Sequence, residues 1–360
     1  MDIVGLDIGG ANIKAVKISF KDSEVTVERV LRIYFPVWIH GGRSIGRKLA
    51  ELKHSLDLES GKYYVGACMT AELSDAFRVK SEGVKVIVES VDEAFHDSLS
   101  NFYVTTEMSL VDSRRAVSNY LKVAASNWAA TAWLLEKQLP TRGITNAILI
   151  DVGSTTTTVI PLVNGRIMVR GYTDPEKLTY GELVYTGVLR GNVATIVDKV
   201  PYKGFLTRVS SERFALTGDV HLLLGYIDSS SYTTETADGR GVSIEEAVER
   251  LSRVPCADAD MMSVREVIEL ARYIYEAQVF RVFEALMQVR TWIASMNVDL
   301  NDFTVVTAGI GEHLAVEAAR RAGFSKFINV DKLVSQQVSS VLPAYASALM
   351  ALDKVLSEAH

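Results

Sequence analysis

The sequence contains few cysteines and no long apolar run. Its two cysteines, Cys68 and Cys256, do not have the spacing of metal ligands. The sequence therefore supports neither a disulfide framework nor a zinc site, and a reducing cytoplasm fits this cysteine content. No apolar run approaches the roughly 18 residues that a membrane span needs, and the start of the chain lacks the basic stretch and apolar core of a signal peptide. We therefore expect a cytoplasmic protein with no membrane partner.

Positive charge is also scarce. The chain has 38 Lys and Arg against 44 Asp and Glu, a net charge of −6, and contains no basic run of five or more residues. This balance argues against a nucleic-acid partner held by backbone electrostatics. A length of 360 residues and a hydrophobic content of 48% suit two domains or one large α/β unit. The expected partners are small-molecule substrates, with a homodimer as an open alternative.

A hydroxyl-rich hairpin is the main feature that the sequence does contain. A strand-like run from Ala147 ends at Asp151, Gly153 follows, and hydroxyl side chains continue from Ser154 to Thr158 before a second strand. Such a turn places backbone N–H groups and hydroxyls around an anion, with a carboxylate beside it for a divalent cation. It predicts a phosphate and Mg²⁺ site, although a single hairpin of this kind could also be a simple tight turn.

The chain begins with a second copy of this hairpin. Asp7 ends a strand, glycines follow, and the polar residue Asn12 precedes a returning strand; Asp7 and Asp151 lie 144 residues apart. The pair favours phosphate binding by two related domains that face one another. The predicted metal-binding and catalytic carboxylates are Asp7 and Asp151. The predicted phosphate-binding residues of the hairpins are Gly9, Gly10, Asn12, Lys14, Gly153, Ser154, Thr155 and Thr156.

The paired hairpins resemble the actin-like ATPase superfamily, which includes sugar kinases, acetate kinase and hydantoinase/oxoprolinase A subunits. The resemblance implies an α/β fold of two RNase H-like domains with the site in the cleft between them. We place these domains at residues 1–140 and 141–342, with a C-terminal helix at 343–360 that packs back across the junction. A third glycine-rich turn, containing Gly309 and Gly311, resembles the nucleotide loop of the superfamily, and a tight strand-to-helix turn is the alternative.

Several polar residues outside the glycine-rich turns are further candidates. Glu72 follows a predicted strand at 63–69, where a carboxylate would face the cleft of an open α/β sheet; a first-turn helix acid is the alternative. The weaker candidates for polar residues of the cleft are Lys122, Asn127 and Glu182. Four element predictions can be checked directly: a strand at 83–91, a helix at 211–226, and capping boxes that start helices at Ser243 and Ser263.

A narrower resemblance rests on four groups of segments. These are Met69-Thr-Ala-Glu-Leu73 with Glu82-Gly83, Lys122-Val-Ala-Ala-Ser-Asn-Trp128, Asp151-Val-Gly-Ser-Thr-Thr-Thr157 and Gly181-Glu-Leu-Val-Tyr-Thr-Gly187. They are similar to the archaeal and methylotroph family of tetrahydromethanopterin-linked C1-transfer proteins, which implies synthesis of the methanofuran core in one-carbon metabolism. In that reaction a furanmethyl diphosphate loses diphosphate, and the phenol oxygen of γ-glutamyltyramine takes the methylene carbon. Members of this family commonly have Asp at the position of Thr158. The family resemblance therefore gives less support to a metal or catalytic role for the second hairpin.

The chemistry of the residues agrees with this alkyl transfer. A cradle for terminal phosphates with Mg²⁺ also suits a diphosphate leaving group. The phenol has an unperturbed pKa of about 10, so a base is needed, and we expect Glu72 to be that base. An ATP-dependent small-molecule kinase or a hydantoinase/oxoprolinase-like hydrolase is the alternative, so ATP stays an open cofactor beside Mg²⁺. A non-catalytic actin-like module is a remote alternative.

Overall fold

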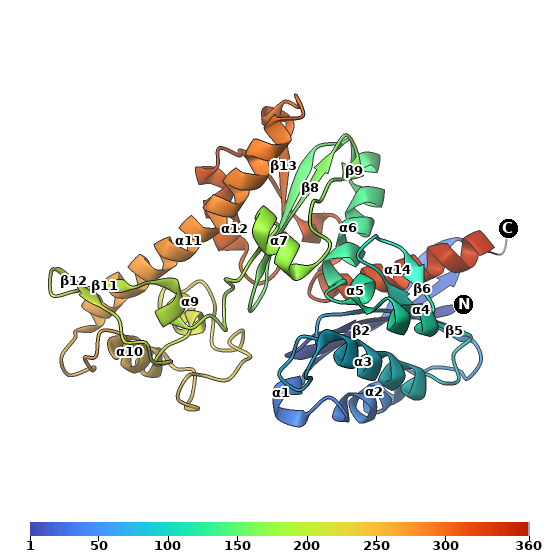
Figure 1. Ribbon diagram of the computed structural model, residues 1–360, viewed down its shortest axis with the longest axis horizontal. Coiled ribbons are helices and arrows are strands. Elements are labelled where there is room, and N and C mark those ends of the chain that lie inside the picture. Colours follow the sequence, from blue (N-terminus) through green and yellow to red (C-terminus); the bar gives the residue numbers. More distant parts are fainter. Residues whose placement is uncertain (359–360) are drawn as a thin grey trace. The chain divides into compact units, whose positions relative to one another are not determined.

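The computed structural model describes residues 1–358 and has an α/β architecture (Figure 1). The chain forms two compact units. The first comprises Met1–Thr145, Val163–Glu176 and Asp331–His360, and the second comprises Asn146–Leu162 and Lys177–Val330. The domain boundaries expected from the sequence, after residues 140 and 342, stay predictions. No helix within residues 1–358 has both the length and the apolar character needed to cross a membrane.

The first unit is built on a six-stranded sheet in the order β3-β2-β1-β4-β5-β6. Strands β1, β2 and β3 form an antiparallel meander, whereas β1, β4 and β5 run parallel. The carboxyl ends of these three parallel strands therefore meet at one edge of the sheet. The strands are β1 (Asp2–Ile8), β2 (Asn12–Lys21), β3 (Glu24–Tyr34), β4 (Tyr63–Met69), β5 (Ser100–Val104) and β6 (Leu110–Val111).

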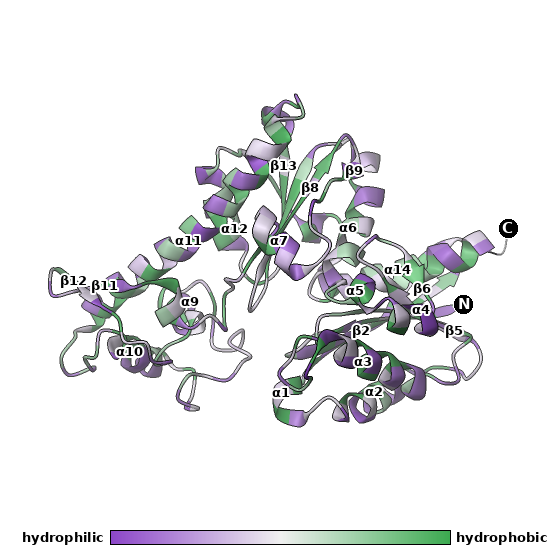
Figure 2. Cartoon of the chain, viewed as in Figure 1, coloured by the Kyte–Doolittle hydropathy of each residue, from purple (hydrophilic) through white to green (hydrophobic). Residues whose placement is uncertain are grey.

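The second unit repeats this topology in a sheet ordered β10-β8-β7-β13-β14. Strands β7 and β8 are antiparallel, and β7, β13 and β14 are parallel. The hydrophobic strand β8 stands out in Figure 2 and is largely buried. The strands are β7 (Ala147–Val152), β8 (Thr157–Val163), β10 (Leu183–Val184), β13 (Thr304–Ala308) and β14 (Lys326–Asn329). The short strand β9 (Arg166–Ile167) belongs to the segment Val163–Glu176 of the first unit.

The two hairpins have the same register, offset by the 144 residues seen in the sequence. Asp7 pairs with Lys14 across β1 and β2, and Asp151 pairs with Thr158 across β7 and β8. Equivalent turn hydrogen bonds join Gly9 N to the carbonyl of Asn12 at 3.0 Å and Gly153 N to the carbonyl of Thr156 at 2.9 Å. The repeated topology confirms the predicted pair of RNase H-like domains.

Helices cover both faces of the first sheet. The C-terminal helix α14 contacts β1, β2, β4 and α6. Glycine is required where α14 crosses the sheet. A Cβ atom at Gly5 would overlap the carbonyl oxygen of Ala344, and a Cβ atom at Gly66 would overlap that of Ser347. The helices are α1 (Val37–His40), α2 (Ser44–His54), α3 (Lys80–Ala94), α4 (Ser113–Ser118), α5 (Tyr120–Val123), α6 (Asn127–Gln138), α13 (Gln336–Ser339) and α14 (Leu342–Glu358).

The second unit contains a long helix, α11, and a small antiparallel hairpin that contacts it. Both predicted capping boxes are confirmed: Ser243 starts α10 and Ser263 starts α11, each with a Glu three residues later. The helices are α8 (Val193–Ile196), α9 (Thr217–Leu223), α10 (Ile244–Ser252), α11 (Val264–Ala294) and α12 (Glu312–Arg321). Helix α7 (Asp174–Tyr180) begins in the first unit and ends in the second. The hairpin strands are β11 (Lys199–Tyr202) and β12 (Phe205–Arg208).

The strand predicted at 83–91 is wrong, because these residues belong to helix α3. The β-branched residues of this segment favoured a strand, but Val84, Ile87, Val88 and Val91 are buried at helical spacing. Gly83 brings the helix against the loop before it, since a Cβ atom there would lie 2.6 Å from the carbonyl oxygen of Glu72. The helix predicted at 211–226 is likewise shorter, and spans only Thr217–Leu223.

Candidate functional site

The carboxylate of Asp7 is buried at the end of β1, with 3% of the residue exposed. Its cross-strand partner Lys14 contacts it through an ion pair of 3.1 Å. The thiol of Cys68 lies below the carboxylate, with Sγ 3.9 Å from Asp7 Oδ1, and burial together with the Asp7 charge raises the pKa of this thiol well above its usual value. Asp7 is therefore held between a neutral thiol and a cation.

The first glycine turn lies beside a hydroxyl from the neighbouring strand end. A Cβ atom at Gly9 would sit 3.5 Å from the Thr70 hydroxyl oxygen, and the carbonyl of Gly10 accepts a hydrogen bond from Val37 N at 2.9 Å. Gly9, Gly10 and Asn12 are each half-buried. The turn thus carries the predicted residues, and Thr70 is an additional polar group that the sequence reasoning missed.

Glu72 lies at the same edge of the sheet as Asp7. The backbone N–H groups of Thr70 and Ala71 both donate to the carbonyl of Ile8, at 2.9 and 3.1 Å, which ties the end of β4 to the end of β1. Glu72 follows in the loop between β4 and α3. It is therefore not a first-turn acid of a helix, and that alternative is wrong.

The Glu72 carboxylate is buried without hydrogen bonds. Only 1% of the residue is exposed, and neither oxygen accepts a hydrogen bond of ordinary geometry from residues 1–358. The backbone of Ala125 lies beside it, and Lys80 Nζ is 3.9 Å from Oε1. Lys80 is closer to Asp174, at 2.8 Å. Burial raises the pKa of Glu72 to about 7; Lys80 opposes this rise and Asp174 adds to it. A carboxylate with these properties is suited to accept a proton near neutral pH.

In the second unit, Asp151 lies against the turn between β13 and α12. Gly309 has a φ of +83°, and a Cβ atom there would come within 2.5 Å of Asp151 Oδ1 and would overlap the carbonyl of Val152. Only glycine allows this approach. Gly311 closes the turn by donating its N–H to the carbonyl of Val152 at 3.0 Å. Thr158 is opposite Asp151, so its hydroxyl lies on the same face of the hairpin.

The hydroxyl turn of the second unit is braced by the segment that follows β10. The N–H groups of Leu189 and Arg190 donate to the carbonyl of Ser154, at 2.9 and 3.0 Å. The Arg190 guanidinium donates to the hydroxyl of Thr155 at 3.3 Å. Ser154, Thr155 and Thr156 are half-buried. Arg190 thus brings a cation to the predicted anion cradle, and no local sequence pattern signals this contact, because 35 residues separate Arg190 from Thr155.

A buried chain of hydrogen bonds fixes the Thr186–Gly187 turn. Gln278 Nε2 donates to the Thr186 hydroxyl and the Gly187 carbonyl, at 2.9 and 3.1 Å. Its Oε1 therefore faces His221 Nε2 at 3.1 Å, and His221 Nδ1 is left to accept from His313 Nε2 at 2.9 Å.

Burial lowers the pKa of both imidazoles, to about 3 for His221 and about 4 for His313, so both are neutral near pH 7. His221 is thus a hydrogen-bonded core residue. A Cβ atom at Gly187 would lie 2.6 Å from the Thr155 backbone, so the chain of hydrogen bonds supports the hydroxyl turn.

The three weaker candidates lie in different surroundings. Lys122 is half exposed and pairs with Glu107 at 2.7 Å. Asn127 is half-buried and is the first residue of α6. Glu182 is fully buried and forms an ion pair with Lys177 at 3.3 Å. The ion pair joins two buried residues of the second unit, and the role of Glu182 as a polar residue of the cleft stays a prediction.

Each hairpin supplies one carboxylate, which suits Mg²⁺ only together with further ligands from a substrate or water. Among residues 1–358, no three His, Cys, Asp or Glu side chains are grouped as a metal site. Mg²⁺ is usually held by one or two carboxylates together with substrate phosphates and water. Asp7 and Asp151, each beside a glycine turn, are consistent with that mode of binding.

The comparisons with known proteins agree with this architecture. The family described as Hydantoinase/oxoprolinase matches residues 64–353. A synthase from Methanocaldococcus jannaschii, named (4-{4-[2-(gamma-L-glutamylamino)ethyl]phenoxymethyl}furan-2-yl)methanamine synthase, is 35% identical over 99% of each chain. The protein of the same name from Methanococcus vannielii is 31% identical over 57% of this chain and 90% of its own.

A solved structure is also similar in fold. The nucleotide-free structure of acetone carboxylase has a TM-score of 0.58 at 9% identity, and the match covers 96% of this chain and 70% of that one. The family match and the full-length relative together show that this chain belongs to the hydantoinase/oxoprolinase family.

Proposed function

We propose that the protein is a transferase that makes the aryl ether of methanofuran biosynthesis. It joins a furanmethyl diphosphate to the phenol of γ-glutamyltyramine and releases diphosphate. The observation that carries this function is the 35% identity to the M. jannaschii synthase along 99% of both chains. The name of that relative describes the product, in which a phenol oxygen is bonded to a furan-bearing methylene.

Glu72 is the proposed base for the phenol. One C–O bond forms between the phenol oxygen and the methylene carbon, and the bond from that carbon to the diphosphate oxygen breaks and leaves its electron pair on diphosphate. The phenol proton passes to Glu72. With its pKa raised to about 7, Glu72 accepts that proton at a cost of about 4 kcal/mol from a phenol of pKa about 10, whereas an ordinary Glu would require about 8 kcal/mol.

The glycine turns are the proposed anion cradle. The hydroxyls of Ser154, Thr155 and Thr156 and the guanidinium of Arg190 would stabilise the charge that develops on the departing diphosphate. Lys14 is a second cation suited to phosphate. Asp7 and Asp151 would hold Mg²⁺, which when bound neutralises part of the diphosphate charge.

The β13–α12 turn supports a second candidate, an ATP-dependent kinase or hydrolase. Gly309 brings backbone directly against Asp151, as a loop that encloses a nucleotide would need. A thermal-shift comparison separates the candidates, because a bound ligand raises the melting temperature by mass action. With Mg²⁺ present, we expect stabilisation by inorganic diphosphate and little by ATP, together with ether formation from the two substrates. A clear preference for ATP and no ether product would reject the transferase.

A further inference from the structure

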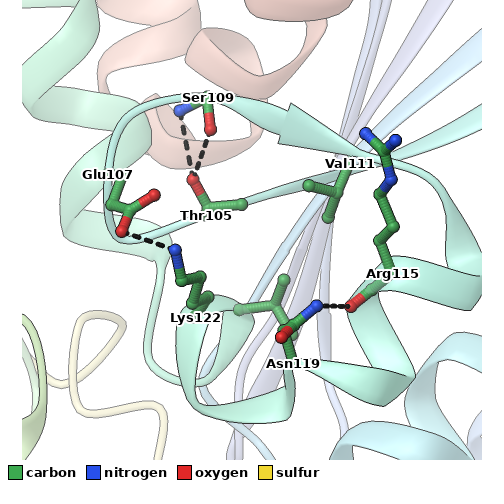
Figure 3. A pocket seen from close by; sticks show the side chains of 8 residues that line it. Thr105, Glu107, Ser109, Val111, Arg115, Asn119 and Lys122 are labelled. Atoms are coloured by element: carbon green, nitrogen blue, oxygen red, sulfur yellow. Dashed lines mark hydrogen bonds and ion pairs between the residues drawn. The ribbon is translucent and has the colours of Figure 1, made fainter.

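A cavity bordered by charged and hydroxyl side chains opens just beyond the carboxyl end of β5. It has a volume of about 160 Å³, far above the roughly 10–15 Å³ that a single water molecule needs by this measure. Figure 3 shows its side chains arranged around a common space between the turn after β5 and the helices α4 and α5. The lining residues are Thr105, Glu107, Ser109, Val111, Arg115, Asn119, Lys122 and Val123.

From the charges of this cavity, we propose that it binds the free amino-acid head group of the phenol substrate. This inference rests on the proposed function. A γ-linked glutamyl group keeps its α-carboxylate and its α-ammonium. Arg115 and Lys122 supply cations for the carboxylate, Glu107 supplies an anion for the ammonium, and hydroxyl and amide groups supply the remaining hydrogen bonds. A guanidinium can hold a carboxylate through two parallel hydrogen bonds.

The walls of the cavity are fixed by short-range hydrogen bonds. The hydroxyl of Thr105 lies 2.8 Å from the hydroxyl of Ser109 and accepts a hydrogen bond from Ser109 N at 3.2 Å. Met108 closes this turn with a φ of +57°. On the opposite side, Asn119 Nδ2 donates to the carbonyl of Arg115 at 3.3 Å. The backbone frame is therefore formed before any ligand binds.

The charged groups can exchange partners when a ligand binds. Lys122 and Glu107 form an ion pair of 2.7 Å, and about half of each side chain is exposed. The guanidinium of Arg115 lies 3.9 Å from the Asp112 carboxylate, and both side chains are mostly exposed. Because exposed ion pairs contribute little stability, a carboxylate and an ammonium can take over these contacts at small cost.

Backbone hydrogen bonds connect the wall of the cavity to the segment beside Glu72. Thr106 N donates to the carbonyl of Lys122 at 2.7 Å, and Ser126 N donates to the carbonyl of Met69 at 3.0 Å. The backbone of Ala125 is beside the Glu72 carboxylate. The three residues from Lys122 to Ala125 span at most about 11 Å. Standard bond lengths place the phenol oxygen of an extended γ-glutamyltyramine about 13 Å from its α-carbon. The length of the substrate is therefore compatible with the span of chain between the two places.

Steady-state kinetics of the full chain test this assignment, with Arg115→Gln, Glu107→Gln and a control, Arg114→Gln. Arg114 is the exposed neighbour on the same helix and does not line the cavity. We expect Arg115→Gln to raise the KM for γ-glutamyltyramine about tenfold or more, with kcat and the KM for the furanmethyl diphosphate within about threefold of wild type. Arg114→Gln should match wild type in all three constants.

Glu107→Gln is tested with two acceptors. Glutaryl-tyramine lacks only the α-ammonium, so wild type should prefer γ-glutamyltyramine and Glu107→Gln should lose most of that preference. If wild type turns over and Arg115→Gln keeps a wild-type KM, or Glu107→Gln keeps the preference, the cavity does not bind the head group. If wild type gives no ether at all, the proposed function itself is wrong.

Discussion

The Glu72 carboxylate lies 3.9 Å from the ammonium of Lys80, which is held more closely by Asp174 at 2.8 Å. The two carboxylates therefore share the Lys80 ammonium, and this cation stabilises the charge of Glu72 less than that of Asp174. No residue within 1–358 donates a hydrogen bond of ordinary geometry to its oxygens. Burial therefore outweighs the opposing effects of Lys80 and of nearby backbone N–H groups, and the carboxylate keeps a pKa of about 7. The relationship among these three residues leaves the pKa of Glu72 in the range that the proposed base requires near neutral pH.

Replacing Glu72 with Gln should lower kcat by about 10²–10⁴, the usual contribution of a general base. The affinity for diphosphate should change little, and this can be measured by calorimetry. In wild type, kcat should rise with pH through about 7 as Glu72 loses its proton. An equal loss of kcat and diphosphate affinity in Glu72→Gln would contradict the assigned role.

The same substitution should stabilise the fold at high pH. Folded Glu72 has a pKa of about 7, above the ordinary value of 4.5, so the folded state keeps a proton that the unfolded state has lost between these values. The free energy of unfolding therefore falls as pH rises through this window, by about 3 kcal/mol. Glu72→Gln should recover that amount at pH 8 and almost none near pH 4.5, as urea denaturation at the two pH values would show.

The two charges beside Glu72 should move its pKa in opposite directions. Lys80→Met removes the cation and should shift the rise of kcat to higher pH, whereas Asp174→Asn removes an anion and frees Lys80, which should shift it to lower pH. Profiles of kcat against pH for the two variants give the measurement. Shifts of the same sign, or none, would show that Glu72 does not control the profile.

Much of the site could be predicted because it is built from local hairpins. Asp7 and Asp151 could be predicted because each ends a strand within a short hairpin motif that occurs twice in the sequence. In the structure both residues have the same register in their hairpins. The pairing of Lys80 with Asp174 joins residues 94 apart in the chain, and only tertiary packing makes such a contact. The contact of Arg190 with Thr155 could not be predicted for the same reason, because 35 residues separate the two.

The error at residues 83–91 has a different physical cause. Val84, Val86, Ile87 and Val88 have the β-branched side chains that strands favour, but burial of one helical face in the first unit overrides that local preference. Gly83, which weakens a helix in isolation, is tolerated because its missing side chain lets α3 pack against the Glu72 backbone.

The two hairpin carboxylates should be essential for product formation. Asp7→Asn and Asp151→Asn should each abolish ether synthesis while the far-UV circular dichroism spectrum stays that of wild type. Asp2→Asn is a matched control, because Asp2 is on the same strand as Asp7 and forms an ion pair with Lys17 at 3.0 Å. Near-normal turnover in either Asp7→Asn or Asp151→Asn would remove that residue from the metal site.

Gly309 should tolerate no side chain. Ala at this position would adopt a φ of +83° and would press its Cβ atom against Asp151 Oδ1. Gly204→Ala is the control, since Gly204 has a φ of +85° and no atom lies within 4 Å of the place that its Cβ atom would take. Both variants should lose about 1–2 kcal/mol from backbone strain, but only Gly309→Ala should also lose most of its kcat/KM. Equal activity in the two variants would show that the turn does not act through Asp151.

Gln278 should matter through the turn that it holds. In Gln278→Met, the His221 Nε2–H group and the Gly187 carbonyl each lose a buried partner, which should cost about 1–3 kcal/mol for each group. The Gly187 backbone packs on Thr155, so the KM for the furanmethyl diphosphate should also rise, while the KM for γ-glutamyltyramine should not. Gln288→Met is the control, because Gln288 is on the same helix and donates to the carbonyl of Thr179 at the surface. If Gln278→Met loses stability but keeps both KM values, the buried chain supports the fold alone and does not position the anion cradle.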